Sequence, residues 1–307
     1  MYSDGNNFIM GRNYWNVLWN INVVALATFC VLMQLFVKVA VDSLHHRQLL
    51  LECIMEYKCC RFFSIYEYLF NLHHLPYFMD EIITDDGSLT YRSEILDEPY
   101  HTKAGAIVEA LEKHARALKV WEKDCPVIFD VCSGLSYSAA CALEEIRSNG
   151  NNSLVTIYLF ENDRTILEKN LNLPDSIKYT QDGALKKITC YHHFKAAIRK
   201  YLHHNINVYK SENLRITLMF GDFYLTINSV EESADFVFYA PFSPMFTPQM
   251  WSYKMFRILF MHMSPHGQLT TYSYAKKVRD ALTEAGFKVR DGPILGRRSP
   301  SLIAAKD

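Results

Sequence analysis

Three carboxylic acids stand at or near the ends of hydrophobic runs that have the length of buried strands. Asp130 lies in the run Val127–Val131, Glu161 ends a second run, and Asp222 follows a third. Helical patterns alternate with these runs, which is typical of a mainly parallel sheet whose strands end at one edge. An acid at the tip of the second strand can accept hydrogen bonds from both hydroxyls of a ribose. The spacing therefore predicts a site for a ligand that contains a nucleoside.

The turn after the first of these strands contains one glycine, Gly134, with Ser133 and Ser136 beside it. A pyrophosphate-binding turn requires the pattern Gly-x-Gly-x-x-Gly, which this turn lacks. A single glycine still allows the backbone to come close to a ligand before the next helix begins. A nucleoside ligand without phosphates needs less from the turn than a dinucleotide does. S-adenosylmethionine is such a ligand.

The elements that position these residues follow from the hydrophobic pattern. We predict strands at residues 88–95, 127–131, 154–160, 214–220, 235–239 and 267–273, and helices at 104–120, 138–147, 165–171, 194–202, after Pro248 and around Arg279. The polar segments 149–153 and 205–213 are predicted to be connections. The predicted fold class is therefore α/β, with a doubly wound, mainly parallel sheet of the Rossmann-like type.

The composition limits the partners of the chain. Half of its 307 residues are hydrophobic, so it can bury a substantial core, and its net charge of −1 gives no general attraction to nucleic acid. A polyanion would have to contact a local basic patch, such as the one between Lys276 and Lys306. The eight cysteines include no Cys-x-x-Cys pair and adjacent histidines diverge, so we predict no metal site. Scattered thiols favour a reducing, cytoplasmic location.

The first 78 residues differ in character from the rest. The segment from Val17 to Val37 is almost wholly apolar and long enough to be considered as a membrane span. Three interpretations stay open: a membrane-anchoring helix over residues 17–37, a buried helical extension, or a sequence upstream of a true start at Met79. We therefore divide the chain into an N-terminal extension, residues 1–78, and a main domain, residues 79–307.

A series of short motifs runs through the main domain. They are Asp86-Gly-Ser-Leu-Thr90, Glu98-Pro-Tyr-His101, Gly105-Ala106, Glu109, Asp130-Val-Cys132, Gly134-Leu135, Tyr137, Phe160-Glu161, Phe220-Gly-Asp222, Pro241-Phe-Ser-Pro244, Pro248, Met250-Trp251, Thr270-Thr-Tyr-Ser273, Ala285-Gly-Phe287 and Gly296-Arg-Arg298. In this order they resemble the methyltransferase domain of the bacterial tRNA 5-methylaminomethyl-2-thiouridine biosynthesis family (MnmC) and its stand-alone relatives. Each motif alone is weak, whereas the ordered series is specific.

The resemblance implies a class I S-adenosylmethionine-dependent methyltransferase with about seven strands. It implies that Gly134 and its neighbours hold the methionine portion of the cofactor, Glu161 the ribose and Asp222 the adenine amino group. The residues expected at the cofactor are Tyr100, Asp130, Cys132, Gly134, Glu161, Asp222 and Phe223. The implied reaction is methylation of the exocyclic aminomethyl nitrogen of a modified wobble uridine in the anticodon loop of tRNA. A separate enzyme is expected to supply the aminomethyl group, since no oxidase domain follows Ala305.

The acceptor is expected to meet the loop Tyr239, Ala240, Pro241 and Phe242, which implies no specific catalytic residue. Family members usually have an aspartate where this chain has Ala240. A slow enzyme, a methyltransferase for another amine and a relative that only binds the cofactor are therefore the alternatives.

Four residues are candidates for substrate contacts. Trp251 and Tyr272 have rings that could stack on an unpaired base, although a tryptophan near a helix start is more often part of the core. Arg297 and Arg298 suit contacts with phosphates, because unpaired arginines are seldom fully buried.

Overall fold

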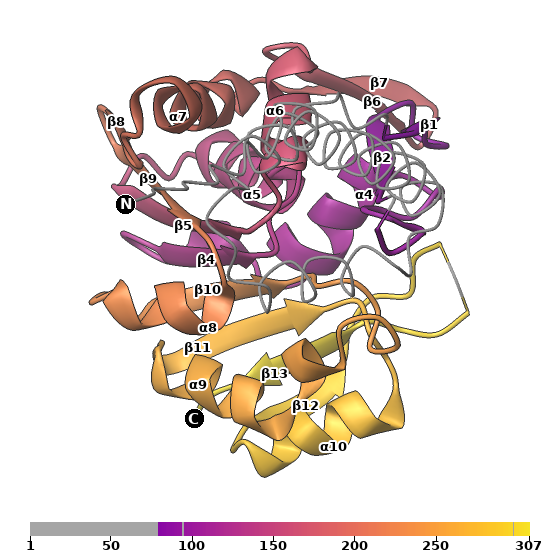
Figure 1. Cartoon of the computed structure of the whole chain (residues 1–307), viewed down its shortest axis with the longest axis vertical. Coiled ribbons are helices and arrows are strands. Elements are labelled where there is room, and N and C mark those ends of the chain that lie inside the picture. The colour runs from indigo at the N-terminus through magenta and orange to yellow at the C-terminus, as the bar shows by residue number, and fades with distance from the viewer. Residues whose placement is uncertain (1–78, 94, 297) are drawn as a thin grey trace, which may run out of the picture. The chain divides into compact units, whose positions relative to one another are not determined.

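The computed structural model describes residues 79–93, 95–296 and 298–307 (Figure 1). Their centre is an eight-stranded sheet in the order β12-β13-β11-β10-β4-β5-β9-β8. The strands are β4 (Val127–Val131), β5 (Val155–Glu161), β8 (Val208–Ser211), β9 (Leu214–Phe220), β10 (Ala234–Tyr239), β11 (Met263–Thr271), β12 (Lys288–Asp291) and β13 (Leu302–Ala305). Five consecutive strands of this order, from β11 to β9, run parallel to one another. At the edges, β8 pairs antiparallel with β9, and β13 pairs antiparallel with both β11 and β12. The predicted α/β class with a mainly parallel sheet is confirmed.

The order of the strands reverses between β4 and β10. From β4 the chain proceeds outward through β5 to β9, then returns to the other side of β4 to form β10 and β11. Neighbouring parallel strands that depart in opposite directions leave a crevice at their carboxyl ends, which is where open α/β sheets bind ligands. In the register of this pair, Asp130 of β4 lies opposite Phe238 of β10. The topology therefore directs attention to the edge that contains Asp130.

Helices cover both faces of the sheet (Figure 1). One face carries α4 (Ala106–Ala110), α5 (Tyr137–Ser148), α6 (Arg164–Asn172) and α7 (Tyr191–His204), and the other carries α8 (Phe223–Thr226), α9 (Tyr253–Met261) and α10 (Lys276–Glu284). Strand side chains alternate between the two hydrophobic clusters. On β5, Ile157 and Leu159 pack under α4 to α7, whereas Tyr158 and Phe160 pack on the side of α8 to α10. The five central strands are thus buried on both faces, which explains their nearly continuous hydrophobic runs.

A smaller sheet precedes the main one and is anchored at its carboxyl edge. It consists of β1 (Glu81–Ile83), β2 (Leu89–Ser93) and β3 (Glu98–Pro99). The Tyr137 hydroxyl at the start of α5 donates to Leu89 O at 2.7 Å. The buried Asp86 carboxylate accepts from the N–H groups of Ile107 and Val108 at 3.0 and 2.9 Å and so caps α4. These contacts fix β3 beside the tips of the main sheet.

Several elements differ from the prediction. The main sheet has eight strands, where about seven were expected. The predicted ranges cover five of them, whereas β8, β12 and β13 were not predicted individually, and β8 occupies part of 205–213, which was predicted to be a connection. β8 is an edge strand with largely exposed side chains, so its polar sequence hid it. The hairpin of β6 (Ile177–Gln181) and β7 (Ala184–Ile188) was also not predicted.

Two predicted helices are interrupted. The one predicted at 104–120 is α4 followed by a π-helical turn at Leu111–Ala115, and Lys119 then has a positive φ of 49°. The one predicted after Pro248 is a separate 3₁₀ turn, Pro248–Trp251, and α9 starts at a new cap, where Ser252 Oγ accepts from Met255 N at 3.3 Å.

Residues 1–78, the predicted helical extension with its possible membrane span at 17–37, lie outside the described residues. The alternative start at Met79 and the division of the chain at that point stay predictions. In the part of the chain that the structure describes, no helix combines the length and the apolar character needed to cross a bilayer.

Candidate functional site

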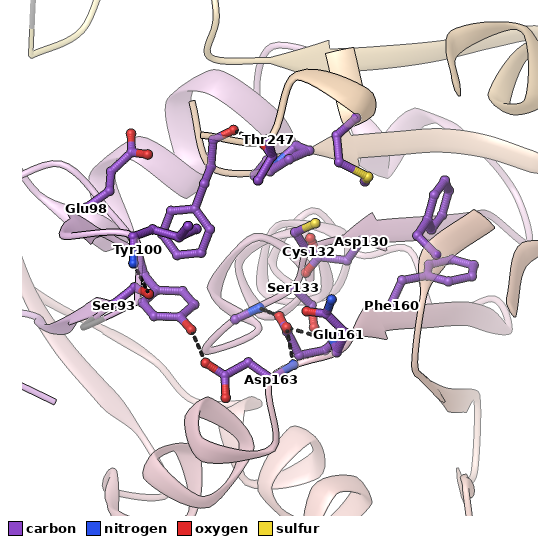
Figure 2. Close-up of a pocket in the computed structure, with 18 of the residues that line it drawn as sticks. Ser93, Glu98, Tyr100, Asp130, Cys132, Ser133, Phe160, Glu161, Asp163 and Thr247 are labelled. Atoms are coloured by element: carbon purple, nitrogen blue, oxygen red, sulfur yellow. Dashed lines mark hydrogen bonds between the residues drawn. The ribbon is translucent and has the colours of Figure 1, made fainter. Parts of the chain in front are cut away.

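A cavity of about 870 Å³ lies at the carboxyl ends of β4, β5, β9 and β10. All seven residues predicted to hold the cofactor line it: Tyr100, Asp130, Cys132, Gly134, Glu161, Asp222 and Phe223. Figure 2 shows Asp130, Cys132 and Glu161 between Tyr100 on one side and Phe160 on the other. The structure therefore brings these seven residues together around one cavity at one edge of the sheet. Their contacts with a ligand stay predictions.

The Glu161 carboxylate supports the turn that follows β4. Its Oε2 accepts from the N–H of Gly134 at 2.7 Å, and its Oε1 accepts from the N–H groups of Asn162 and Asp163 at 2.8 and 2.9 Å. Burial raises the pKa of Glu161 to about 7, while the three N–H donors act in the opposite direction. Each carboxylate oxygen has two acceptor sites, so Oε1 is filled and Oε2 keeps one site for a ribose hydroxyl. Glu161 can thus hold the turn and a ligand at once.

Asp130 lies almost fully buried beside Glu161. Its Oδ2 accepts from the N–H of Ala139 in the first turn of α5 at 3.2 Å. Burial, with a contribution from the nearby Glu161 charge, raises the pKa of Asp130 to about 8. Two buried acids with raised pKa values favour a positively charged ligand, because a cation stabilises both ionised forms. A sulfonium has that charge.

Two features favour glycine at position 134: its positive φ and the close approach of the Tyr100 ring. Its φ is +50°, and a Cβ there would lie 3.1 Å from Cδ1 of Tyr100. The Tyr100 hydroxyl donates to Asp163 Oδ2 at 2.6 Å, and its ring meets Phe242 edge-on with centroids 4.9 Å apart. Burial, then the Asp163 charge, raises the pKa of Tyr100 further above 10. Tyr100 therefore connects the small sheet, the turn and the loop after β10.

The far end of the cavity is aromatic. Phe160 and Phe223 meet edge-on, with ring centroids 4.9 Å apart. The exposed Asp222 directly precedes Phe223 and caps α8, where its Oδ1 accepts from Tyr224 N at 2.7 Å. A planar base could enter between these rings and the strand tips, and Asp222 Oδ2 could accept from its amino group.

The loop after β10 closes the other end. Ala240, Pro241 and Phe242 line the cavity, whereas Tyr239 is fully buried behind it and donates to Met250 O. No titratable side chain of residues 239–242 thus faces the cavity.

The predicted substrate residues lie at different places. Tyr272 lines the cavity and donates to Pro241 O at 2.9 Å, while Trp251 is 4% exposed and donates from Nε1 to Phe242 O at 2.8 Å. Trp251 therefore supports the loop from below and is outside the cavity lining. Arg298 is exposed and also outside the lining, and Arg297 lies outside the described residues.

The sequence argument missed further lining residues, notably Glu98, His101, Glu109, His114 and Asp163. Glu109 accepts from Lys113 Nζ at 2.6 Å, and His114 shares a 2.6 Å hydrogen bond with Thr270 on β11. Burial lowers the pKa of His114 to about 4, so this histidine is neutral. Glu98, Tyr100, His101 and Glu109 belong to motifs that were recognised, but their convergence depends on the small sheet. For Asp163, its position before a helical pattern was the available signal.

A ligand as polar as S-adenosylmethionine suits the residues present. Ser133 Oγ is buried in the lining and has no hydrogen-bond partner among the described residues. A buried hydroxyl without a partner is costly, and a polar ligand group would satisfy it. Among the same residues, no cluster of three or more His, Cys, Asp or Glu side chains has the arrangement of a metal site.

Comparison with known proteins agrees with this geometry. Residues 189–307 match a family described as S-adenosyl-L-methionine-dependent methyltransferases. The crystal structure of MNMC2 from Aquifex aeolicus is 26% identical and superposes with a TM-score of 0.57, covering 88% of this chain and 83% of that one.

Two curated proteins illustrate the sequence relationship. An uncharacterized protein of Methanocaldococcus jannaschii is 29% identical over 225 residues, which are 73% of this chain and 58% of that protein. The tRNA 5-methylaminomethyl-2-thiouridine biosynthesis bifunctional protein MnmC of Ralstonia nicotianae is 34% identical over 98 residues, 32% of this chain and 15% of that protein. The chain thus matches only part of the length of each relative. The fold is that of class I methyltransferases, and the cofactor is S-adenosylmethionine.

Proposed function

We propose that this chain, which carries an MnmC-like methyltransferase domain, methylates the aminomethyl nitrogen of a modified wobble uridine in the anticodon loop of tRNA. One observation carries the proposal. The cavity has a buried acid, Glu161, at the strand tips and a further acid, Glu98, at the end that Ala240 also lines, so it has room and charge for a cationic cofactor and an amine. The name of the MnmC relative, a tRNA 5-methylaminomethyl-2-thiouridine biosynthesis protein, supports tRNA as the molecule that presents the amine.

The chain's own residues would hold the cofactor from three sides. Glu161 would accept from a ribose hydroxyl, the Gly134 turn would approach the methionine portion, and Phe160 with Phe223 would enclose the base. Asp222 would accept from the adenine amino group. When bound, the cofactor supplies a methyl group on a sulfonium. Enclosure by Tyr100 excludes water and fixes the line of transfer, an orientation effect that accounts for much of the rate in such reactions.

The charge of the lining supports an amine acceptor. Within the described residues it contains six carboxylic acids, Glu98, Glu109, Asp130, Glu161, Asp163 and Asp222, against one lysine, Lys254. An acceptor phosphate would be repelled here, whereas an alkylamine would be attracted. A tRNA would therefore insert one unstacked nucleotide, as enzymes that modify bases generally require, and keep its phosphates outside near residues such as Arg298. We propose in addition a cytoplasmic location and a separate enzyme that supplies the aminomethyl group.

A second candidate is a relative that binds the cofactor and transfers no methyl group to tRNA, or transfers it to another amine. Ala240 favours this alternative, because it provides no carboxylate at the tip of β10. Loss of a positioned base typically lowers a rate by about 10²- to 10⁴-fold.

The decisive experiment uses the purified full-length chain. Calorimetry measures S-adenosylmethionine binding, and radiolabelled methyl transfer is measured on tRNA with and without the aminomethyl uridine. We expect binding together with transfer to the aminomethyl tRNA only. Binding without transfer to either tRNA would select the second candidate, and transfer to a free polyamine instead of tRNA would select another amine substrate.

A further inference from the structure

The carboxylates of the cavity differ in what they already bind. Glu109 is neutralised by Lys113, and its Oε2 also accepts from the Thr102 backbone and hydroxyl. Asp163 accepts from the Tyr100 hydroxyl and from Thr165 N, which it caps. These two acids therefore have structural partners that account for their charge.

The remaining acids lie at separate strand tips, with one exception. Asp130 is the last but one residue of β4, Glu161 ends β5, and Asp222 comes after β9. All three lie on the side of the sheet where the nucleoside would bind. Glu98 comes from β3 instead. It is the one lining carboxylate, among the described residues, that is bonded to the segment after β10.

The contact of Glu98 is specific. Its Oε2 accepts from the backbone N–H of Ser243 at 2.9 Å, and its Oε1 has no partner in the part of the chain that the structure describes. β3 holds it through pairing with β2, in which Ser93 lies opposite Glu98. Figure 2 shows Glu98 and Tyr100 on the side of the cavity opposite Phe160. This is the acceptor end if the base of the cofactor lies against Phe160.

We propose that Glu98 is a catalytic carboxylate that orients the acceptor amine and takes its proton. This role rests on the proposed function. The amine enters with a neutral nitrogen, whose lone pair forms the new N–C bond to the methyl carbon as the C–S bond breaks. The bonding pair of the C–S bond stays on sulfur, which becomes a neutral thioether. The methylated nitrogen becomes positive and gives one proton to Glu98 Oε1.

Other side chains near the loop are less suited to this role. Tyr239 donates its hydroxyl proton to Met250 O and lies behind the cavity wall. His114 is engaged with Thr270, and Ala240 has no polar group. The anchored position of Glu98, with one oxygen held and one oxygen without a partner, matches the need for a base that is fixed in place.

Glu98→Gln separates charge from structure. The glutamine carbonyl can still accept from Ser243 N–H, so a residue that merely anchors the loop would tolerate this change. We expect kcat for methyl transfer to aminomethyl tRNA to fall by about 10²-fold in Glu98→Gln, with S-adenosylmethionine affinity within twofold of wild type. The kcat of Glu98→Ala should fall at least as far. Asp97→Asn is the matched control, since Asp97 is the adjacent carboxylate, is exposed and is outside the lining.

Restoring a carboxylate provides a second test. Ala240 lines the same end of the cavity, so Glu98→Gln combined with Ala240→Asp should recover at least about tenfold of the lost kcat. Equal kcat in wild type and Glu98→Gln would overturn the role while leaving the proposed function intact. A wild-type chain that binds the cofactor but transfers no methyl group to aminomethyl tRNA would defeat the proposed function and this role together.

Discussion

The backbone N–H of Gly134 donates to Glu161 Oε2 at 2.7 Å, joining the turn after β4 to the tip of β5. The two residues are 27 positions apart in the chain. One carboxylate thus sets the shape of the turn that would face the methionine portion and would offer its remaining acceptor site to the ribose. A change at Glu161 should therefore disturb both parts of the cofactor site.

Glu161→Ala should weaken S-adenosylmethionine binding by about 10²-fold or more, because hydrogen bonds to a charged group each contribute roughly 1.5–3 kcal/mol. Glu161→Gln should lose less affinity, since its amide keeps one acceptor oxygen. Titration calorimetry on the full chain measures both. Glu168→Ala is the control, because Glu168 is exposed and pairs with the exposed Arg164. Unchanged affinity in Glu161→Ala would remove this residue from the site.

Cofactor binding should depend on pH. The pKa values of Glu161 and Asp130, raised to about 7 and about 8, mean that both acids ionise as the pH rises from 6 to 8.5. Ionised acids attract a sulfonium, so affinity for S-adenosylmethionine relative to the uncharged thioether S-adenosylhomocysteine should increase over this range, by roughly tenfold. Calorimetry in buffers of different ionisation enthalpy should show proton release on binding. A ratio that falls with pH contradicts the assignment.

Gly134→Ala should lower cofactor affinity by about tenfold or more. An alanine at a φ of +50° is strained by roughly 1–2 kcal/mol, and its Cβ would press on Tyr100. The control is Gly183→Ala in the β6–β7 turn, where φ is +74° and no atom of the described residues lies within 4 Å of the added Cβ. Both variants should lose similar stability in chemical denaturation, but only Gly134→Ala should lose affinity. Equal cofactor affinities of Gly134→Ala and Gly183→Ala would contradict this prediction and would mean that the Tyr100 ring moves aside for the added Cβ.

Trp251→Phe should separate binding from transfer. It removes the Nε1–H that bonds Phe242 O at 2.8 Å, at a cost of about 1 kcal/mol, and that carbonyl keeps its bond from the Thr247 hydroxyl at 2.7 Å. We expect the loop to lose its position, so that methyl transfer falls about tenfold while cofactor affinity stays within twofold. Trp121→Phe, at the other hydrophobic cluster, is the control. A parallel loss of affinity and rate would place Trp251 at the cofactor instead.

Asp130→Asn should stabilise the cofactor-free protein at alkaline pH. The pKa of Asp130 is raised from 3.8 to about 8, so the wild type loses stability as the pH rises from about 4 to about 8. An asparagine has no such titration, so its advantage in free energy of unfolding should grow over this interval to a few kcal/mol. Urea denaturation at pH 5 and pH 8.5 measures the difference. A constant difference would mean that Asp130 is not buried as an acid.

Patterns within a strand predicted the central part of the fold well. The runs at 127–131 and 214–220 coincide with β4 and β9, because strands buried on both faces must be continuously apolar. Asp130 and Asp222, which lie near the ends of these runs, could be assigned to one edge because parallel neighbours end at the same edge of a sheet. The class of fold and the cofactor are confirmed.

Residues that converge through distant contacts could not be predicted in this way. Tyr100 reaches Asp163 across 63 positions, and Glu98 reaches Ser243 across 145, through a small sheet whose strands are two to five residues long. Such short strands give too little pattern to be placed. An aromatic ring such as Trp251 is equally suited to a core or to base stacking, and only the packing around it decides.

The position of β13 affects how the protein can fold during synthesis. Residues 302–305 are made after β11 and β12, yet they pair antiparallel with β11 on one side and β12 on the other. Until they leave the ribosome, β12 lacks the strand that it pairs with among the described residues and the β11 edge is open, so the nascent chain carries an unprotected strand edge. Shielding of that edge by a chaperone, and sensitivity to premature stop codons close to residue 302, are the expected biological consequences.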